Sequence, residues 1–172
     1  VLGIGLGGAV VIAVDLANES ARSAFRLSME AVVGKATHQI VGGPGGIPEQ
    51  AYVDLRLYGG GWPSAPVVEG TVYHQGQAYS LLGIDPLADK PFRAGLTDIG
   101  DVDLERLLLD PASLLLPAAL AERLGSGLDQ QLSLEIAGAT TEARIVGLFD
   151  SDNPAAREGL LVTDLASAQE LL

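Results

Sequence analysis

Hydrophobic and polar residues recur with different periods along the chain, and the first segment is apolar throughout. Fourteen residues precede the first charge at Asp15, and residues 9–14 (AVVIAV) are apolar on every face of a helix. This length falls short of the roughly twenty residues that span a bilayer. Residues 1–14 are therefore predicted to be the end of a transmembrane helix, and a buried soluble helix is the alternative. The side chains expected to be embedded in the membrane are Val10, Val11, Ile12 and Val14.

The same segment contains a glycine motif that is typical of dinucleotide-binding loops. Gly3, Gly5 and Gly8 spell G-x-G-x-x-G, a pattern in which a strand leads into the first glycine and an amphipathic helix follows the last. Only two residues precede Gly3, and the residues after Gly8 have no polar face. Because both neighbours of a cofactor loop are missing, we expect no bound cofactor. Gly3, Gly7 and Gly8 instead suit close packing between helices in lipid.

From Asp15 the chain becomes amphipathic without a break in helix-forming residues. Gly34 is placed to end this helix in a left-handed turn. Small and apolar side chains recur every three or four positions and mark one helix face, formed by Ala17, Ala21, Ala24, Phe25, Ser28 and Val32. A single helix is therefore expected to leave the membrane and continue in water.

Two shorter elements are predicted next. Residues 36–41 (ATHQIV) alternate and indicate a strand with His38 and Ile40 on the same face. Pro48 and Glu49 suit the first turn of a helix that ends at three glycines after Tyr58. This helix is expected to bury one set of side chains, namely Ile47, Ala51, Tyr52 and Leu55.

The remaining pattern predicts two hairpins and three short helices. The strands are expected at 66–73, 78–84, 131–136 and 141–149. The helices are expected at 103–109, at 117–124 with Gly125 as its stop, and from Asp164 onward. A polar loop over 150–157 and a short apolar run over 160–162 separate the second hairpin from the last helix.

The charge balance excludes one class of partner. Ten basic and twenty-two acidic residues give a net charge of −12, and no segment concentrates Lys or Arg. Because a protein that binds the phosphate backbone needs a basic surface, nucleic acid is not an expected partner. The same charge repels anionic lipid headgroups.

Side chains able to carry catalysis are few. The chain has no Cys, and its two imidazoles, His38 and His74, fall on separate predicted strands. The candidate nucleophiles Ser64, Ser80 and Ser113 lack the G-x-S-x-G setting of a hydrolase. His38 is expected to be a half-buried strand residue and His74 a hairpin residue. We therefore expect no catalytic residue.

Two acidic pairs are candidate chemical sites. Asp101 with Asp103, and Asp150 with Asp152, have the spacing of paired carboxylates. The run from Asp150 to Asn153 also has the start of a cation-binding rhythm, but the glycine and the bidentate Glu of an EF-hand do not follow. These carboxylates are expected to be solvated, and no metal site is predicted.

Several stretches, in order, resemble the extracytoplasmic core domain of FtsX/MacB-type ABC transporter permeases. The segment APVVEGTVYHQGQAYSLLGIDP resembles the family's strand pair and its G-[IV]-D-P turn. The segment LLLPAALAERLGSGLDQQLSLEIAGATTEARIVGLF resembles its helix, glycine turn, hairpin and exit strand. GLLVTDLASAQELL resembles the strand and helix that follow, and a membrane helix that runs into a polar helix precedes them all.

The resemblance implies an α+β fold of two lobes, a mixed α/β lobe and an inserted β-rich lobe, preceded by the end of a transmembrane helix. The implied division is 1–14 in the membrane, 15–59 at the start of the α/β lobe, 60–150 in the inserted lobe, and 151–172 returning to the α/β lobe. The chain lacks an initiator Met and stops within an apparent helix, so both ends are expected to be cuts in a longer protein and the first lobe to be truncated.

The resemblance also implies a function. It indicates a non-catalytic domain on the periplasmic side of the bacterial cytoplasmic membrane, which couples ATP-driven membrane motion to a partner protein or hydrophobic cargo. The ATPase belongs to a separate subunit or domain, and the full permease is dimeric or pseudo-dimeric. A membrane-anchored module that binds a small ligand is the alternative. A soluble nucleotide-dependent enzyme is disfavoured by the missing strand and the missing catalytic set.

Overall fold

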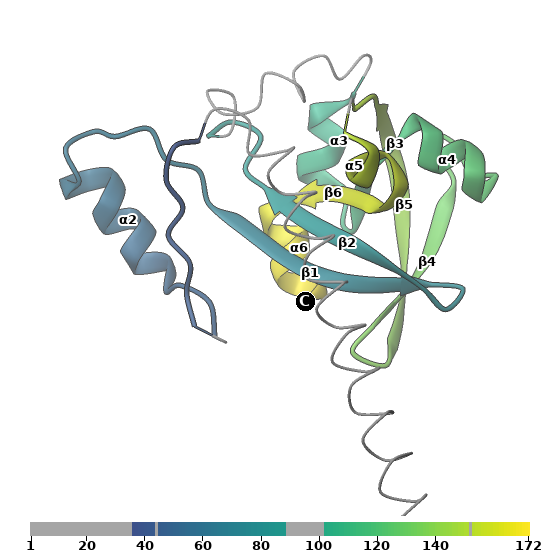
Figure 1. Ribbon diagram of the computed structural model, residues 1–172, viewed down its shortest axis with the longest axis horizontal. Coiled ribbons are helices and arrows are strands. Elements are labelled where there is room, and N and C mark those ends of the chain that lie inside the picture. The colour runs from purple at the N-terminus through teal and green to yellow at the C-terminus, as the bar shows by residue number, and fades with distance from the viewer. Residues whose placement is uncertain (1–35, 44, 89–101, 152) are drawn as a thin grey trace, which may run out of the picture.

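The computed structural model of the chain describes residues 36–43, 45–88, 102–151 and 153–172 (Figure 1). The predicted transmembrane segment, with Val10, Val11, Ile12 and Val14, and the amphipathic segment after it lie outside the described residues. The described helices are α2 (Glu49–Tyr58), α3 (Leu104–Leu109), α4 (Ala118–Leu124), α5 (Pro154–Gly159) and α6 (Leu165–Leu171). The described strands are β1 (Val67–His74), β2 (Gln77–Ile84), β3 (Ser113–Pro117), β4 (Gln131–Ile136), β5 (Ala139–Phe149) and β6 (Leu160–Asp164).

The strands form one closed barrel in the order β1-β2-β6-β3-β5-β4. The hairpins β1–β2 and β4–β5 are antiparallel, as predicted, whereas β6 runs parallel to β2 and β3 runs parallel to β5. The barrel closes where Tyr73 of β1 pairs with Glu135 of β4. With helices packed around a mixed barrel, the predicted α+β class is confirmed.

The central strands of the barrel are buried on both faces. In β3, Leu114 and Leu116 face one side of the sheet and Leu115 faces the other, because successive side chains alternate along a strand. The inner cluster contains Val72, Tyr79, Leu81, Leu114, Leu116, Leu120, Ala121, Leu132, Leu134, Ile136, Ala143, Ile145 and Leu161. The outer cluster, to which α3 and α5 contribute, contains Leu82, Ile84, Leu107, Leu115, Val146, Phe149, Ala156, Leu160 and Val162.

α6 packs directly on β1 and β2, where two glycines leave room for it. A Cβ atom added at Gly83 would lie 2.2 Å from the Cβ of Ala168, and one added at Gly70 would lie 2.3 Å from a methyl carbon of Leu172. Asp164 caps α6, because its Oδ1 accepts hydrogen bonds from the backbone N–H groups of the first turn. The helix predicted from Asp164 is therefore confirmed.

Two elements of the structure, β3 and α5, are not predicted by the sequence pattern. β3 lies between the two short helices predicted at 103–109 and 117–124, which are themselves confirmed as α3 and α4. The predicted polar loop over 150–157 is wrong in its second half, because α5 begins at Pro154 with Asn153 as its N-cap. Asn153 Oδ1 accepts hydrogen bonds from the N–H groups of Ala155 and Ala156, which satisfies the first turn of this helix.

Both hairpin turns use left-handed backbone at two successive residues. Gln75 and Gly76 have φ values of +51° and +76°, and Ala137 and Gly138 have φ values of +50° and +85°. This pattern is that of the type I′ turn, whose twist matches the strands it joins. Gly125, with φ at +63°, ends α4 as predicted.

Ala137→Asn is expected to raise the free energy of unfolding by about 1 kcal/mol. Ala137 holds a left-handed conformation in which a Cβ atom is strained, whereas Asn followed by Gly is the preferred pair in this turn. Urea denaturation of the chain measures the change. Ala139→Asn, just beyond the turn at the start of β5, is the matched control and should bring no gain; equal gains from both would contradict the assignment to turn strain.

Two predictions near the start of the described chain are wrong. Residues 36–41 form no strand; the nearest pairing is an isolated bridge between Gly43 and Gly46. Because no described strand pairs with residues 36–41, their alternating side chains do not become part of a sheet. Its side chains from Thr37 to Ile40 are exposed, so His38 is not half-buried.

α2 ends at Gly59 as predicted, but it does not bury the side chains assigned to it. No residue of α2 is buried. Tyr52 and Leu55 are half-buried, whereas Ile47 and Ala51 are exposed. Among the residues that the structure describes, no helix is both long enough and apolar enough to cross a membrane.

Candidate functional site

The candidate catalytic side chains of the sequence lie apart. His38 Nδ1 lies 3.0 Å from the hydroxyl of its neighbour Thr37, while His74 at the end of β1 bonds to the carbonyl oxygen of Ser133 at 2.8 Å. Ser113 is buried and donates to the carbonyl oxygen of Leu107 at 2.7 Å. The first contact is local to adjacent exposed residues and the other two join separate segments, and none of them joins a candidate serine to a histidine.

Two of the four paired carboxylates lie within the described residues, and one of them caps a helix. Asp103 is the N-cap of α3 and accepts from the N–H of Arg106 at 3.1 Å, and Asp150 is exposed after β5. Asp101 and Asp152 lie outside the described residues. Within the described part of the chain, no group of three or more potential metal ligands comes together.

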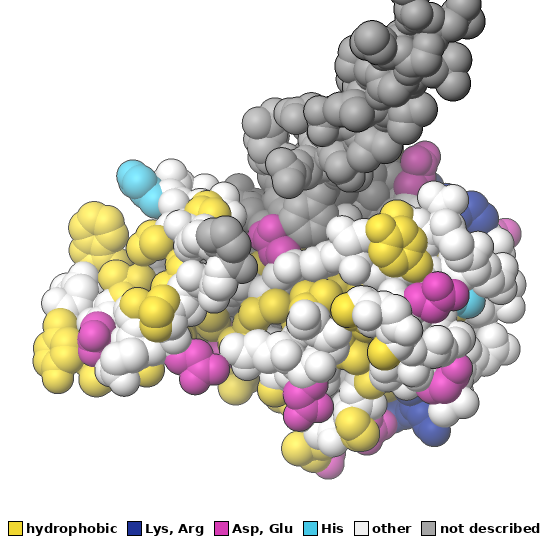
Figure 2. All heavy atoms as spheres, turned by 90° about the horizontal axis from the view of Figure 1, so that it is seen from below, with side chains coloured by type: hydrophobic (Ala, Val, Ile, Leu, Met, Phe, Trp, Pro, Cys, Tyr) yellow, Lys and Arg dark blue, Asp and Glu magenta, His cyan; other side chains and the backbone are white. Residues whose placement is uncertain are grey.

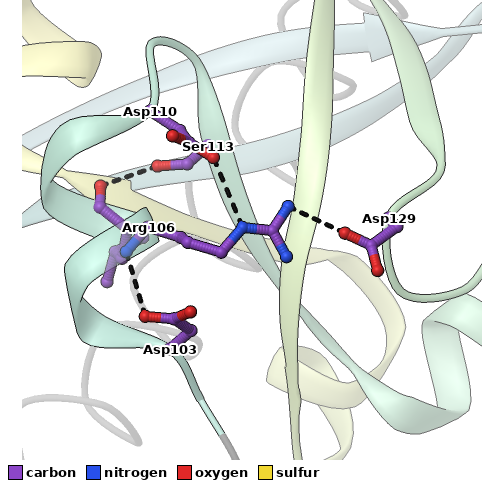
Figure 3. A network of polar contacts seen from close by, with 6 residues as sticks. Asp103, Arg106, Asp110, Ser113 and Asp129 are labelled. Atoms are coloured by element: carbon purple, nitrogen blue, oxygen red, sulfur yellow. Dashed lines mark hydrogen bonds and ion pairs between the residues drawn. The ribbon is translucent and has the colours of Figure 1, made fainter.

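Arg106 is the centre of the polar network in Figure 3. Its guanidinium reaches from α3 to Asp129, in the loop before β4, with Nη2 2.7 Å from Oδ1, while Nε lies 3.4 Å from Oδ2 of Asp110 (Figure 3). The hydrogen bond to Asp129 is the main cause that raises the pKa of Arg106 above its usual value. Asp129 has a left-handed backbone with φ at +64°, and its N–H donates to Ile145.

This network attaches α3 to the loop before β4, and it does not form an active site. The Arg106 side chain is 32% exposed and that of Asp129 is 68% exposed, so solvent screens their attraction. Its cation is already matched by two carboxylates. We therefore assign it a positioning role at the surface of the barrel.

Exposed apolar side chains gather around α2, which is unusual for the surface of a soluble domain. We define the apolar arm as residues 40–62, excluding Pro44. Its exposed large side chains, with their exposed fractions, are Ile40 69%, Val41 75%, Ile47 43%, Val53 42%, Leu57 68%, Tyr58 82% and Trp62 68%. Figure 2 shows hydrophobic side chains gathered at the end of the molecule where Figure 1 places α2.

Within the described residues, two side-chain hydrogen bonds attach the apolar arm to the rest of the molecule. Tyr52 on α2 donates its hydroxyl to the carbonyl oxygen of Ser64 at 3.3 Å. Gln169 on α6 donates to the carboxylate of Glu49 at 3.2 Å. Because single exposed apolar residues are common but contiguous ones mark interaction sites, the arm is the best candidate functional surface in the described residues.

A sequence signal for this surface was present and was assigned the wrong role. Aromatic residues make up only 5% of the chain, yet Tyr58 and Trp62 flank three consecutive glycines. The apolar positions of α2 predict a core-facing stripe, which is the usual meaning of such a pattern. In the structure they are the exposed surface of an arm.

Comparison with known proteins gives one sequence relative and a shared fold. No protein-family model matches the chain. The chain is 37% identical, over 178 aligned positions, to an uncharacterized ABC transporter permease protein of Mycobacterium tuberculosis. The alignment covers 99% of this chain but 21% of that permease, so the chain spans about a fifth of its relative's length.

The fold of the chain was compared with solved structures. The extracellular domain of the noncanonic ABC-type transporter YknZ from Gram-positive bacteria matches with a TM-score of 0.51 at 15% identity, over 74% of this chain and 67% of that one. The periplasmic region of MacB from Actinobacillus actinomycetemcomitans matches with a TM-score of 0.45 at 8% identity, over 81% of this chain and 65% of that one. The chain is thus similar to an ABC transporter permease over almost its whole length, and it has the fold of the extracellular domain of YknZ, in agreement with the resemblance in its sequence.

Proposed function

We propose that this chain couples ATP-driven movement of a membrane permease to a partner protein or hydrophobic cargo outside the cytoplasmic membrane. The observation that carries the proposal is the apolar arm, because it leaves an interaction surface exposed on an otherwise well-packed barrel. The similarity to a permease over 99% of the chain supports a transporter context. ATP hydrolysis would then belong to a separate subunit or domain of the transporter.

The proposed membrane attachment lies at the start of the chain. In this proposal residues 1–14 end the first transmembrane helix, with Val10, Val11, Ile12 and Val14 in the lipid, and the described residues lie on the periplasmic side. The full permease would be dimeric or pseudo-dimeric. Movement of the membrane helix would reach the barrel through the segment that follows it.

The apolar arm up to Gly59 is proposed to belong to the first part of the α/β lobe, residues 15–59, and its last three residues to begin the inserted lobe. An amphipathic helix gains stability mainly from packing its apolar face, yet no residue of α2 is buried. We propose that other parts of the permease polypeptide cover this face. The bond from Gln169 to Glu49 supports this division, because it joins the returning segment 151–172 to α2.

The barrel is suited to transmit motion as a unit. Its central strands are packed on both faces, and densely packed interiors resist deformation. β6 lies between β2 and β3, so the returning segment and the inserted segment 60–150 share one sheet. A displacement applied at the arm and α6 would therefore move the barrel as a whole.

A single introduced thiol tests whether the permease covers the arm. These 172 residues contain no Cys, so Leu57→Cys gives one reactive site here in a permease otherwise freed of cysteines. Maleimide should label this site several-fold more slowly in the intact permease than in the isolated chain. Thr140→Cys, at the exposed start of β5, is the matched control and should react equally in both.

Two outcomes would overturn the assignment of the arm. One is equal labelling of Leu57→Cys in the permease and in the isolated chain. The other comes from Trp62, the only tryptophan of the chain, which is 68% exposed. If its fluorescence in the isolated chain is already that of a buried indole, the arm is covered within the chain and needs no other part of the permease.

A further inference from the structure

A second feature of the barrel is a cavity at the end where the β1–β2 turn lies. It has a volume of about 430 Å³, within the range of small-ligand sites. Three elements meet around it: the β1–β2 hairpin, the end of α4 and the end of α5. The lining side chains are His74, Gln75, Gln77, Tyr79, Arg123, Leu124 and Glu158.

Tyr79 places a polar group in the cavity that no part of the described protein uses. The residue is 6% exposed, and its ring belongs to the inner cluster. Within the described residues its hydroxyl forms no hydrogen bond with a protein group, and the oxygen is not sealed from solvent. The hydroxyl therefore opens into the cavity. Because no protein group occupies this hydroxyl, it is available to bond to a ligand in the cavity.

Arg123 supplies a positive charge at the cavity wall. Its guanidinium crosses from α4 to donate to the backbone carbonyl of Glu158, which fixes its direction. Within the described residues Arg123 forms no ion pair, and a guanidinium has five N–H donors. Donors therefore remain for a carboxylate ligand, which guanidinium groups bind with charge-assisted hydrogen bonds.

The other lining groups favour a ligand that also carries an amide. The Nδ1 atom of His74 bonds to a carbonyl oxygen, which only accepts, so the neutral ring has Nε2 as an acceptor. Gln75 and Gln77 offer side-chain amides, which pair well with peptide groups. The carboxylate of Glu158 repels a purely anionic ligand but accepts from an N–H group.

We infer that this cavity binds a ligand that presents a carboxylate next to an amide, as the C-terminal end of a peptide does. Arg123 and the Tyr79 hydroxyl would hold the carboxylate, and Glu158 with the two glutamines would hold the amide. The site lies at the Gln77 end of β2, whereas α6 packs near Gly83 at the other end. The inference goes beyond the proposed function and does not depend on it.

Titration of the ¹⁵N-labelled chain by NMR with three small probes tests the inference. The probes are N-acetyl-Ala-Ala with a free carboxylate, the same peptide amidated at its C-terminus, and succinate. The free acid should shift the amide resonances of the β1–β2 turn and the end of α4. The amidated peptide should bind at least about tenfold more weakly, because it lacks the charge-assisted contact. Succinate should also bind more weakly, because it offers no N–H to Glu158.

Three variants separate binding from folding. Arg123→Gln should weaken the free acid about tenfold, whereas Arg157→Gln, on α5 but outside the cavity lining, should leave its affinity unchanged. Tyr79→Phe should weaken it several-fold while leaving the urea midpoint unchanged, because the hydroxyl bonds to no described protein group. Equal affinity for the acid and the amide, an unchanged affinity in Arg123→Gln, tighter binding of succinate, or no shift at the cavity would overturn the inference.

Discussion

Leu161→Ala is expected to lower the free energy of unfolding by about 2–5 kcal/mol, the cost of removing a large aliphatic side chain from a closed core. Leu161 is fully buried in β6, and it pairs across the sheet with Leu81 of β2. Both residues belong to the inner cluster. The strand is held between β2 and β3, so its backbone has little freedom to move into the space that the alanine leaves. Urea denaturation of the chain, followed by circular dichroism, measures the loss.

The matched control for this substitution is Leu109→Ala at the end of α3. Leu109 is 72% exposed, so the same chemical change should cost less than about 0.5 kcal/mol. The comparison also tests the position of β6. If Leu161→Ala is as mild as Leu109→Ala, residues 160–164 do not form a central strand, and the returning segment is not part of the barrel.

Much of the fold could be predicted from local pattern. The two hairpins alternate over their length and are joined by short turns, so both were found within a few residues of their bounds. The caps at Asp164 and Gly125 likewise act through their own backbone neighbours. Such signals are local, because period, turn and cap depend on residues close together in sequence.

The strand that the sequence does not predict, β3, and the closure of the barrel depend on contacts between residues that are far apart in the sequence. β3 consists of Leu114, Leu115 and Leu116 between Ser113 and Pro117, and all five residues are buried. A strand covered on both faces has no alternation to reveal it. Its neighbours, β5 and β6, begin about 25 residues or more further along the chain, so nothing nearby in the sequence indicates them.

The candidate surfaces could be predicted even less well, for a related reason. The stripe on α2 has the same appearance in sequence whether it faces a core or an empty side of the molecule. The cavity is built by His74, Arg123 and Glu158, which three separate elements bring together. The sequence predicts His74 as a hairpin residue. It does not indicate that Arg123 and Glu158 lie near His74, because they come from distant segments. The family resemblance, by contrast, drew on the order of many weak motifs, and the comparisons confirmed it.

Gly83→Ala is expected to destabilise the chain by about 1–3 kcal/mol, the cost of overpacking a tight contact. The new methyl group would lie 2.2 Å from the Cβ of Ala168, whereas two carbons at rest are about 3.5–4.0 Å apart. Neither Cβ can rotate away, so α6 must shift from β2. The same shift would weaken the bond from Gln169 to Glu49 that joins α6 to the apolar arm.

A double-mutant cycle distinguishes this contact from a general intolerance of alanine at Gly83. Ala168→Gly alone should cost about 1 kcal/mol, because glycine is unfavourable inside a helix. The double variant should lose less than the sum of the two single losses, since the second change removes the atom that the first one meets. Gly127→Ala, with no atom near the added carbon, is the matched control and should change stability by less than about 0.5 kcal/mol. Strict additivity in the cycle would mean that α6 does not pack on Gly83, and the proposed path from the arm through α6 to the barrel would lose its contact between α6 and β2.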